Sequence, residues 1–572
     1  MKNIKYIILF LVLGLAGCNS NFLDRAPDVN LDEQKVFTDF LNAQRFHADI
    51  YSGLTSRFNA VGNFQPVPLS SAADESESPA GYHGTKGFNM GNYDGLDANI
   101  SFYYTAIRKA NLFLKNAAVV PFPDNKTKDQ MLGEVYFLRA FYFNEMLKRF
   151  GGMPILTEKD LLVPGDDLMR PRDTYRDCFA FIMADLSKAI SFLPVTLNTN
   201  EYGRATKGAA MALKARMLLY ASSPLFSLKT GIWGMGGNVD DWMDKDGKSW
   251  WLKAAEAAKA VIELKDADGN LAYALYRTAA ANKADDYEKQ FFKRRETGNK
   301  EVIFYKHEAP VGFNSAEINV WMPSGDFGGA GAVEPTQNFV NLYEMANGKY
   351  IDEQGSGYDP AKPYLNRDPR FYKTIIYHGS TWQGATMDLS TTTAQFPAGT
   401  FLTGYFVRKY IPEEIKKASS TTAYHNWIFF RLAEMYLNYA EAMNEAEGPS
   451  QQVRDAVNIV RARSGVIDLP VALTGDKKSM RMRIQRERAM ELSFEEQRWW
   501  DVRRWSTGEE GELATKMFGG PFNRMVITKS GNALTYKEEA YFTRIYQPNN
   551  NLYQIPLGEM YKNPLFVQNP GY

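Results

Sequence analysis

The sequence predicts a mainly α-helical fold in which antiparallel helix hairpins stack side by side as a solenoid. Two observations predict this fold class. Apolar residues recur at helical spacing in many segments, which are joined by short turns rich in Gly and Pro. One long interval, residues 266–425, is instead rich in Gly, Pro, Asp, Thr and aromatic residues. We expect this interval to form a loop-rich subdomain with short strands that covers one side of the helices.

The predicted helices lie in both the first and the last parts of the chain. Periodicity runs from near Glu33 to about Leu54, and it returns at residues 104–116, 131–150, 178–192, 206–222, 250–264, 428–445, 451–464 and 479–505. Gly151, Gly152 and Pro154 end the helix 131–150. The helix 206–222 presents a face of small residues that allows a neighbouring helix to come close, at Ala209, Ala210, Ala212 and Ala215.

We divide the chain into five parts. Residues 1–17 are predicted to be a lipoprotein signal peptide and residues 18–30 a lipidated tether. Residues 31–265 are predicted to form a helical scaffold, residues 266–425 the loop-rich region, and residues 426–572 the C-terminal helical hairpins with an irregular tail. Within the scaffold, residues 58–99 are rich in Gly, Pro, Ser and Asn and are expected to be loop. Loops on a rigid scaffold are where binding groups gather.

The N-terminus has the pattern of an export signal. Lys2 and Lys5 precede an apolar run at residues 6–15, and Ala16-Gly17-Cys18 follows. The run is about half of the roughly 20 residues that a spanning helix needs. The segment resembles a bacterial lipoprotein box, which predicts cleavage before Cys18, lipidation of that cysteine and attachment to a membrane by acyl chains. The alternative is an ordinary signal peptide in which the cysteine is incidental.

Composition excludes several classes of function. Lys plus Arg and Asp plus Glu both number 66, whereas a nucleic-acid-binding protein usually has a basic surplus. After Cys18 the single remaining cysteine is Cys178, in an apolar helix, so a disulfide scaffold and a cysteine-based zinc site are excluded by count. The five histidines are scattered singly, and no nucleophile elbow, phosphate loop or zinc-protease motif is present. We therefore expect no enzyme, no cofactor and no bound metal.

Three acidic segments resemble functional motifs. Residues 74–77, Asp-Glu-Ser-Glu, contain enough carboxylates for glycoside hydrolysis, but a polar turn or a ligand contact is the preferred interpretation. Residues 244–247 and 266–269 imitate part of an EF-hand, yet Lys253 and Leu275 stand where its last glutamate belongs, so both are predicted to be turns. Calcium held by other loop oxygens stays an open alternative.

A further charged segment lies in the tail, at residues 486–504, where Arg and Glu alternate with apolar residues. We interpret it as a structural helix. Arg488 is expected to pair with Glu491 on one helix face, while Arg503 and Arg504 reach outward.

Several motifs, taken together and in order, resemble the RagB/SusD family of surface lipoproteins from Bacteroidetes. The resemblance covers nearly the whole chain and is weakest in the loops. The segments that carry it are Cys18 with residues 22–24, residues 137–143 running into 150–154, and residues 214–221, 430–442, 487–501, 555–556 and 568–572. It implies a scaffold of tetratricopeptide-type helical hairpins. It also implies a partner, a SusC-type TonB-dependent transporter of the outer membrane, over which the protein would sit as a lid facing the cell exterior.

By this resemblance the protein binds an oligosaccharide without breaking it and delivers it to the transporter. Aromatic residues make up 14% of the chain, and tyrosine and tryptophan suit stacking on sugar rings. The candidate ligand-binding residues are Tyr82, Tyr93, Trp321 and Trp382 for stacking, and Asp74, Asn89 and Asp326 for hydrogen bonds. Two alternatives stay open: a peptide-binding lid on the same scaffold and a secreted glycoside hydrolase.

Overall fold

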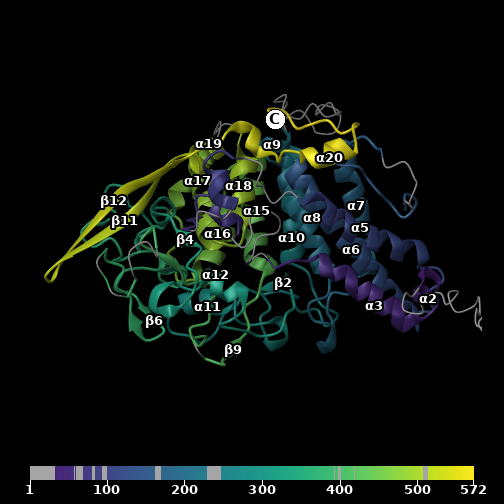
Figure 1. Ribbon diagram of the computed structural model, residues 1–572, viewed down its shortest axis with the longest axis horizontal. Coiled ribbons are helices and arrows are strands. Elements are labelled where there is room, and N and C mark those ends of the chain that lie inside the picture. The colour runs from purple at the N-terminus through teal and green to yellow at the C-terminus, as the bar shows by residue number, and fades with distance from the viewer. Residues whose placement is uncertain are drawn as a thin grey trace, which may run out of the picture.

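The helices of the protein form a stack, and a loop-rich region packs against one side of it (Figure 1). The computed structural model describes residues 32–56, 58, 68–79, 84–92, 99–161, 169–227, 247–391, 393, 395–396, 401–417, 419–506 and 513–572. Within these residues no helix is long and apolar enough to cross a membrane.

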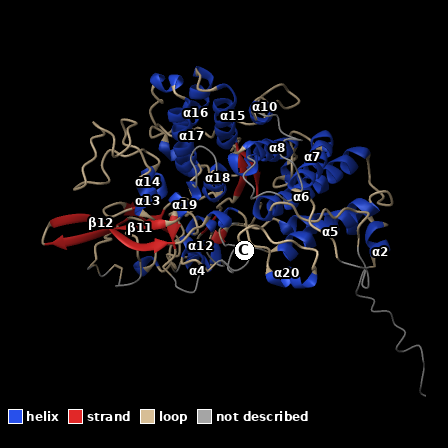
Figure 2. Cartoon of the chain, turned by 90° about the horizontal axis from the view of Figure 1, so that it is seen from above, coloured by secondary structure: helices blue, strands red, loops and turns tan. Residues whose placement is uncertain are grey.

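The long helices follow one another through the stack in chain order, as the view from above shows (Figure 2). Each packs against the next in the series α3 (Phe40–Ile50), α5 (Ile100–Asn116), α6 (Asn125–Phe150), α7 (Tyr175–Phe192), α8 (Lys207–Ser222), α10 (Lys248–Ile262) and α15 (Leu432–Glu447). Both α16 (Gln451–Arg463) and α17 (Lys477–Glu491) pack against α15. The mainly α-helical stack is confirmed, while the tetratricopeptide type of the hairpins and the five-part division stay predictions.

Short polar side chains begin most of these helices. Asp124, Thr174, Thr206 and Ser450 each accept the backbone N–H three residues ahead, which satisfies a donor that the first helical turn leaves unpaired. At the other end of α6, Gly151 has a φ of 74°, which favours glycine. A Cβ on the next residue, Gly152, would lie 1.9 Å from the carbonyl oxygen of Asp173, so the chain can pass there only without a side chain.

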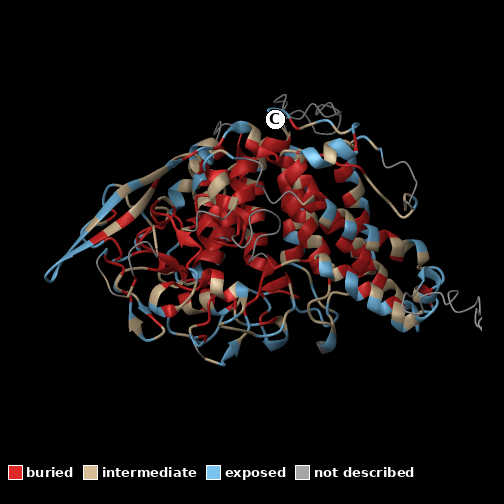
Figure 3. Cartoon of the chain, viewed as in Figure 1, coloured by how far each residue is buried: buried red, intermediate tan, exposed pale blue. Residues whose placement is uncertain are grey.

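The core lies mostly between the helices (Figure 3). The four alanines predicted to form a small-residue face on α8 are all fully buried, and α8 packs against α10, as expected. Cys178 is buried as predicted, and its thiol donates to the carbonyl oxygen of Met153 at 3.2 Å. The C-terminal motif returns to the end of α6, where Asn569 Nδ2 donates to the carbonyl oxygen of Phe150 at 3.0 Å.

Short antiparallel strand pairs tie the loop-rich region to the rest of the protein. β1 (Ser76–Glu77) pairs with β4 (Glu334–Pro335), so the loop that begins near residue 58 meets the 266–425 region. β2 (Val302–Tyr305) pairs with β10 (Ile428–Arg431), directly before α15. The other pairs in the described residues are β3 (Val311–Gly312) with β9 (Thr422–Ala423), β5 (Ile375–Ile376) with β8 (Phe406–Val407), and β6 (Thr381–Trp382) with β7 (Ala385–Thr386).

Short helices complete the described part of the chain. They are α2 (Glu33–Phe37), α4 (Gly84–Asn89), α9 (Pro224–Ser227), α11 (Ala284–Lys289), α12 (Ala316–Trp321), α13 (Gln337–Val340), α14 (Phe371–Thr374), α18 (Gln497–Trp505), α19 (Leu513–Phe518) and α20 (Leu557–Lys562).

Three predicted elements need correction. Residues 428–431 form β10 rather than the first turn of a helix. The helix predicted over 479–505 is two helices, α17 and α18, because Phe494 and Glu496 both take a φ of 59° at the turn between them. The tail contains a long hairpin, β11 (Gly520–Ser530) with β12 (Ala533–Arg544), that projects from one end of the molecule (Figure 1). Its signal was the Ser-Gly-Asn turn between two stretches rich in β-branched and aromatic residues.

Candidate functional site

Three of the predicted functional residues, Cys18, Tyr82 and Tyr93, lie outside the described residues. Lipidation at Cys18 and stacking by the two tyrosines therefore stay predictions. The other five candidates are all described, and they fall into two groups: four are buried, and one, Asp326, is exposed on the turn Gly325–Phe327.

Asp74 and Asn89 have their hydrogen-bonding partners inside the protein. Asp74 is 2% exposed and accepts two hydrogen bonds from Arg498, at 2.9 and 2.8 Å. Asn89 is also 2% exposed, and its Nδ2 donates to the Ser71 carbonyl oxygen at 2.9 Å and to Glu77 at 3.2 Å. Since both side chains are enclosed and paired, the expectation that they face a ligand is corrected: here they hold the loop to the core.

Trp321 and Trp382 are core residues rather than open stacking surfaces. Trp321 is 1% exposed and its Nε1 donates to the carbonyl oxygen of Phe58 at 2.9 Å. The rings of Phe58, Tyr410 and Phe494 meet it edge-on. Trp382 is fully buried, with the Arg408 guanidinium 5.5 Å from its ring centre. The structure does not present Trp321 as the stacking surface predicted for it, because α12 turns its ring into the core.

The acidic segment 74–77 belongs to a buried cluster of charges. Glu75 accepts the Phe494 backbone N–H at 2.6 Å, Glu77 pairs with Arg544 at 2.7 Å, and Glu334 faces Glu77 across the β1–β4 pair. Burial raises the pKa of Glu75 to about 8, even though the Phe494 N–H lowers it. Carboxyl groups enclosed in this way have no contact with a substrate, so the cluster supports the loop rather than hydrolysis.

The tail motif forms a second network of buried charges, and its pairs differ from those predicted. Arg488 pairs with Asp501 at 2.8 Å rather than with Glu491. Arg503 and Arg504 are each 1% exposed instead of reaching outward, because Arg504 is paired with Glu441 and Asp501.

Glu491 of the same motif is paired with a different set of arginines, Arg370, Arg431 and Arg463. Burial alone would raise its pKa, but Arg463, Arg431 and Arg370 lower it to about 2. The structural interpretation of this helix therefore stands, with a different set of ion pairs.

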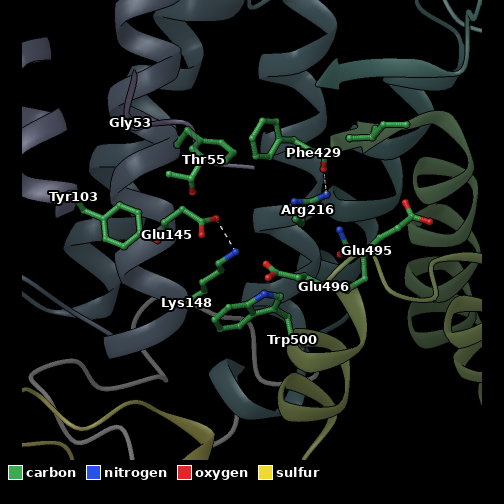
Figure 4. Close-up of a pocket in the computed structure, with 13 residues that line it drawn as sticks. Gly53, Thr55, Tyr103, Glu145, Lys148, Arg216, Phe429, Glu495, Glu496 and Trp500 are labelled. Carbon is green, nitrogen blue, oxygen red and sulfur yellow. Dashed lines mark hydrogen bonds and ion pairs between the residues drawn. The ribbon is translucent and has the colours of Figure 1, made fainter. Parts of the chain in front are cut away.

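The pocket in Figure 4 is too small for a sugar. Its volume is about 40 Å³, and its walls include Glu145, Lys148, Arg216, Glu496 and Trp500. Ligand pockets usually measure about 300–1,000 Å³. A charged cavity of this size fits a few water molecules. A second groove of about 530 Å³ lies between α7, α8 and α10, and its walls combine aliphatic and methionine side chains with Phe179, Trp250, Lys214, Lys253 and Glu256.

Exposed residues of the loop-rich region include Asp326, Lys417, Thr422 and Tyr424, on the surface around the β3–β9 pair, and β9 lies at the lower edge in Figure 1. We call this area the β3–β9 surface and define it by Phe313, Asp326, Lys417, Thr422 and Tyr424. A Cβ at Gly328 would lie 2.8 Å from Lys417 Cδ and 3.2 Å from the Phe313 ring, so this turn, which carries Asp326, lies against both side chains.

The β3–β9 surface includes one of the residues predicted from the sequence and one that was missed. Asp326 is exposed there, and its role in binding stays a prediction. Tyr424 was not predicted. It lies in Thr-Ala-Tyr-His-Asn-Trp, where the residue order does not reveal which of three neighbouring rings faces outward.

Among the described residues, no group of three or more His, Cys, Asp or Glu side chains is arranged to hold a metal ion. The Asp-Gly segment at 266–269 is a turn, as predicted, because Asp266 Oδ1 accepts the backbone N–H groups of Asp268 and Asn270. In the other predicted turn, residues 244–246 lie outside the described residues.

Comparisons with known proteins agree with the fold. The sequence profile of the SusD family matches residues 284–572, and a profile described as "Starch-binding associating with outer membrane" matches residues 21–219. The chain is 24% identical over 428 residues to SusD-like protein P38 of Formosa agariphila, covering 70% of each chain.

Solved structures extend the comparison to nearly the full length. The chain is similar to a SusD-like protein from Bacteroides fragilis, with a TM-score of 0.76 and 26% identity, covering 96% of this chain and 100% of the other. It also shares its fold with a SusD-like carbohydrate binding protein of the same organism, with a TM-score of 0.70 and 21% identity over 92% of this chain and 98% of the other.

Proposed function

The chain belongs to the SusD family, and on that premise we propose that it captures oligosaccharides at the cell surface without cleaving them. The observation that carries the proposal is the agreement of sequence and fold along the chain with SusD-like proteins, one of which is named as carbohydrate binding. The exposed polar and aromatic groups of the β3–β9 surface support it. Asp74, Glu77 and Glu491 are each paired with a buried arginine, which supports binding over hydrolysis.

We further propose that the protein is anchored through lipid on Cys18 to the outer membrane and acts as a lid on a SusC-type TonB-dependent transporter. The description of the family profile that matches residues 21–219 names outer-membrane association, which supports this location. The lipoprotein box that ends at Cys18 supports the anchor.

Calorimetric titration of a protein beginning at residue 19 tests the binding proposal. The titrants are starch, laminarin, an acidic polygalacturonate and a mixture of peptides. We expect heat of binding with at least one polysaccharide and unchanged chain length of that polysaccharide afterwards. Binding to peptides alone would establish the peptide-binding alternative, and shortening of the polysaccharide would establish the hydrolase.

The anchor and the partner are tested in cells that express the full chain. Mass spectrometry of the N-terminal peptide is expected to show a lipidated Cys18, and Cys18→Ser is expected to leave the membrane fraction. The matched control is Cys178→Ser, which keeps the signal intact and is expected to stay with the membrane. Cross-linking followed by purification is expected to recover a TonB-dependent transporter, and repeated recovery without one would contradict the lid.

A further inference from the structure

Tyr424 differs from nearly all other aromatic residues of the described chain in its exposure. Among the Phe, Tyr and Trp side chains that the structure describes, the exposed ones are Tyr424, at 39%, and Tyr561, at 84%. Tyr561 lies on the short helix α20, which has no buried residue of its own. Tyr424 lies on the β3–β9 surface, directly after β9.

The backbone that carries Tyr424 is held on both sides. Before it, β9 pairs with β3. After it, the backbone N–H of Asn426 donates to the Phe291 carbonyl oxygen at 2.9 Å, and Asn426 Nδ2 donates to the Lys293 carbonyl oxygen at 3.1 Å. The next side chain, His425, points inward and stacks on Phe58 with 4.0 Å between ring centres. The tyrosine is therefore presented outward by a fixed segment.

A buried guanidinium supports one face of the tyrosine ring. The Cζ of Arg294 lies 3.7 Å from the ring centre of Tyr424, and Arg294 is only 7% exposed. Arg294 Nη1 is 3.0 Å from His307 Nε2 and 3.5 Å from Glu296 Oε1, which fix the guanidinium in place. Because the arginine lies beneath the ring, the exposed part of the tyrosine is its opposite face. A cation stacked on a ring stabilises this orientation.

We propose that the outer face of Tyr424 is a stacking platform for one pyranose ring of an uncharged oligosaccharide. An aromatic ring fixed before binding loses little conformational freedom when the ligand arrives. Its flat apolar face matches the C–H face of a sugar, while the half-exposed imidazole of His307 beside it offers a hydrogen-bonding group for hydroxyls. This assignment rests on the proposed function and names the subsite and the chemical class of the ligand.

The charges near Tyr424 favour an uncharged sugar over an acidic one. Arg294 lies beside Glu296, and Lys306, which precedes His307 in the chain, pairs with Glu308 at 2.9 Å. Arg294 and Lys306 are thus each matched by a carboxylate. A sulfate or uronate group would have to compete with Glu296 and Glu308 for Arg294 and Lys306, whereas a neutral sugar needs no cation.

Titration of wild type, Tyr424→Ala, Tyr424→Phe and Tyr561→Ala tests the platform, with starch and laminarin as neutral probes and polygalacturonate as the acidic one. For a neutral polysaccharide that the wild type binds, we expect Tyr424→Ala to raise Kd tenfold or more, since loss of a stacking ring costs on that order. Tyr424→Phe keeps the ring and is expected to stay within threefold. Tyr561→Ala removes a more exposed ring elsewhere and is expected to leave Kd unchanged.

The possible outcomes separate this inference from the proposed function. If the wild type binds a neutral polysaccharide and Tyr424→Ala binds it equally well, the platform is wrong while the proposed function stands. Binding of polygalacturonate alone overturns the assignment of an uncharged ligand. Binding of no polysaccharide overturns both. Thermal unfolding of each variant, which we expect to match the wild type because Tyr424 is exposed, shows that a lost affinity is not lost folding.

Discussion

Replacing Glu334 with glutamine tests the physical account of the buried acidic cluster. The side chain is fully buried, and its Oε2 accepts the backbone N–H groups of Leu402 and Thr403, at 2.7 and 2.8 Å. Its Oε1 has no hydrogen-bond partner among the described residues. Burial raises the pKa of Glu334 to about 8, against the effect of the two N–H groups, and the neighbouring Glu77 raises it further. The carboxyl group is therefore mostly protonated at neutral pH.

This protonation links folding to pH in a defined direction. The unfolded chain releases the proton near the ordinary pKa of 4.5, whereas the folded protein keeps it up to about pH 8. Between these two values each rise of one pH unit lowers the free energy of unfolding by about 1.4 kcal/mol. Over the whole window the loss is at most about 5 kcal/mol. Glutamine has the same shape without the ionisation, so Glu334→Gln is expected to be more stable than the wild type at pH 8 and to differ little at pH 5.

Urea denaturation followed by tryptophan fluorescence, repeated in steps from pH 5 to pH 8, measures this difference. The wild type is expected to lose more stability per pH unit than Glu334→Gln, by about 1.4 kcal/mol. Glu75 stays in both proteins and contributes equally, so its effect cancels. The matched control is Glu263→Gln, whose side chain is 64% exposed and whose pH dependence should equal that of the wild type. Parallel pH profiles for Glu334→Gln and the wild type would refute the reasoning.

Three further predictions follow from the buried groups. Arg431→Met removes a cation that contacts the carboxylates of Glu301, Glu491 and Glu495, and it is expected to lower the free energy of unfolding by roughly 3–5 kcal/mol. Urea denaturation measures this loss at pH 7, and part of it should be recovered at pH 5; equal losses at both pH values would contradict the prediction. Trp321→Ala is expected to lower the free energy of unfolding by about 3–5 kcal/mol, while the folded variant keeps its affinity in calorimetric titration. Unchanged stability with a lost affinity would instead place Trp321 in the binding surface. Burial raises the pKa of Cys178 to about 12. In a protein that begins at residue 19, Ellman's reagent should therefore detect no reactive thiol in the folded state and one thiol after unfolding in guanidinium. Rapid labelling of the folded protein would show instead that the thiol is accessible.

Local pattern predicted most of the helices but few of the residues that face solvent. The alanines of α8 were recognised because their spacing follows the helical period, which is a property of neighbouring residues. The break between α17 and α18 was not recognised, because the group that accepts the Phe494 N–H is Glu75, which lies far away in the sequence. Periodicity within a segment carries no information about such a partner.

The candidate site was predicted least well, for the same reason. Trp321 looked exposed from its polar neighbours, yet Phe58 and Phe494, far from it in sequence, close over it. Arg504 looked outward-facing because arginines usually are. Its burial depends on Glu441, which the sequence places on another helix. Tyr424 could not be singled out because its exposure depends on Arg294 taking the position beneath it.

The buried ion pairs also determine how the protein can move. Arg370 of the loop-rich region pairs with Glu487 of α17, and Arg431 joins Glu301 to Glu491. Sliding the loop-rich region away from the helices would leave full charges facing each other across a dry gap, at a cost of several kcal/mol for each. The two parts should thus travel together as one piece. If the protein acts as the proposed lid, the swing that admits a sugar would then pivot outside this body.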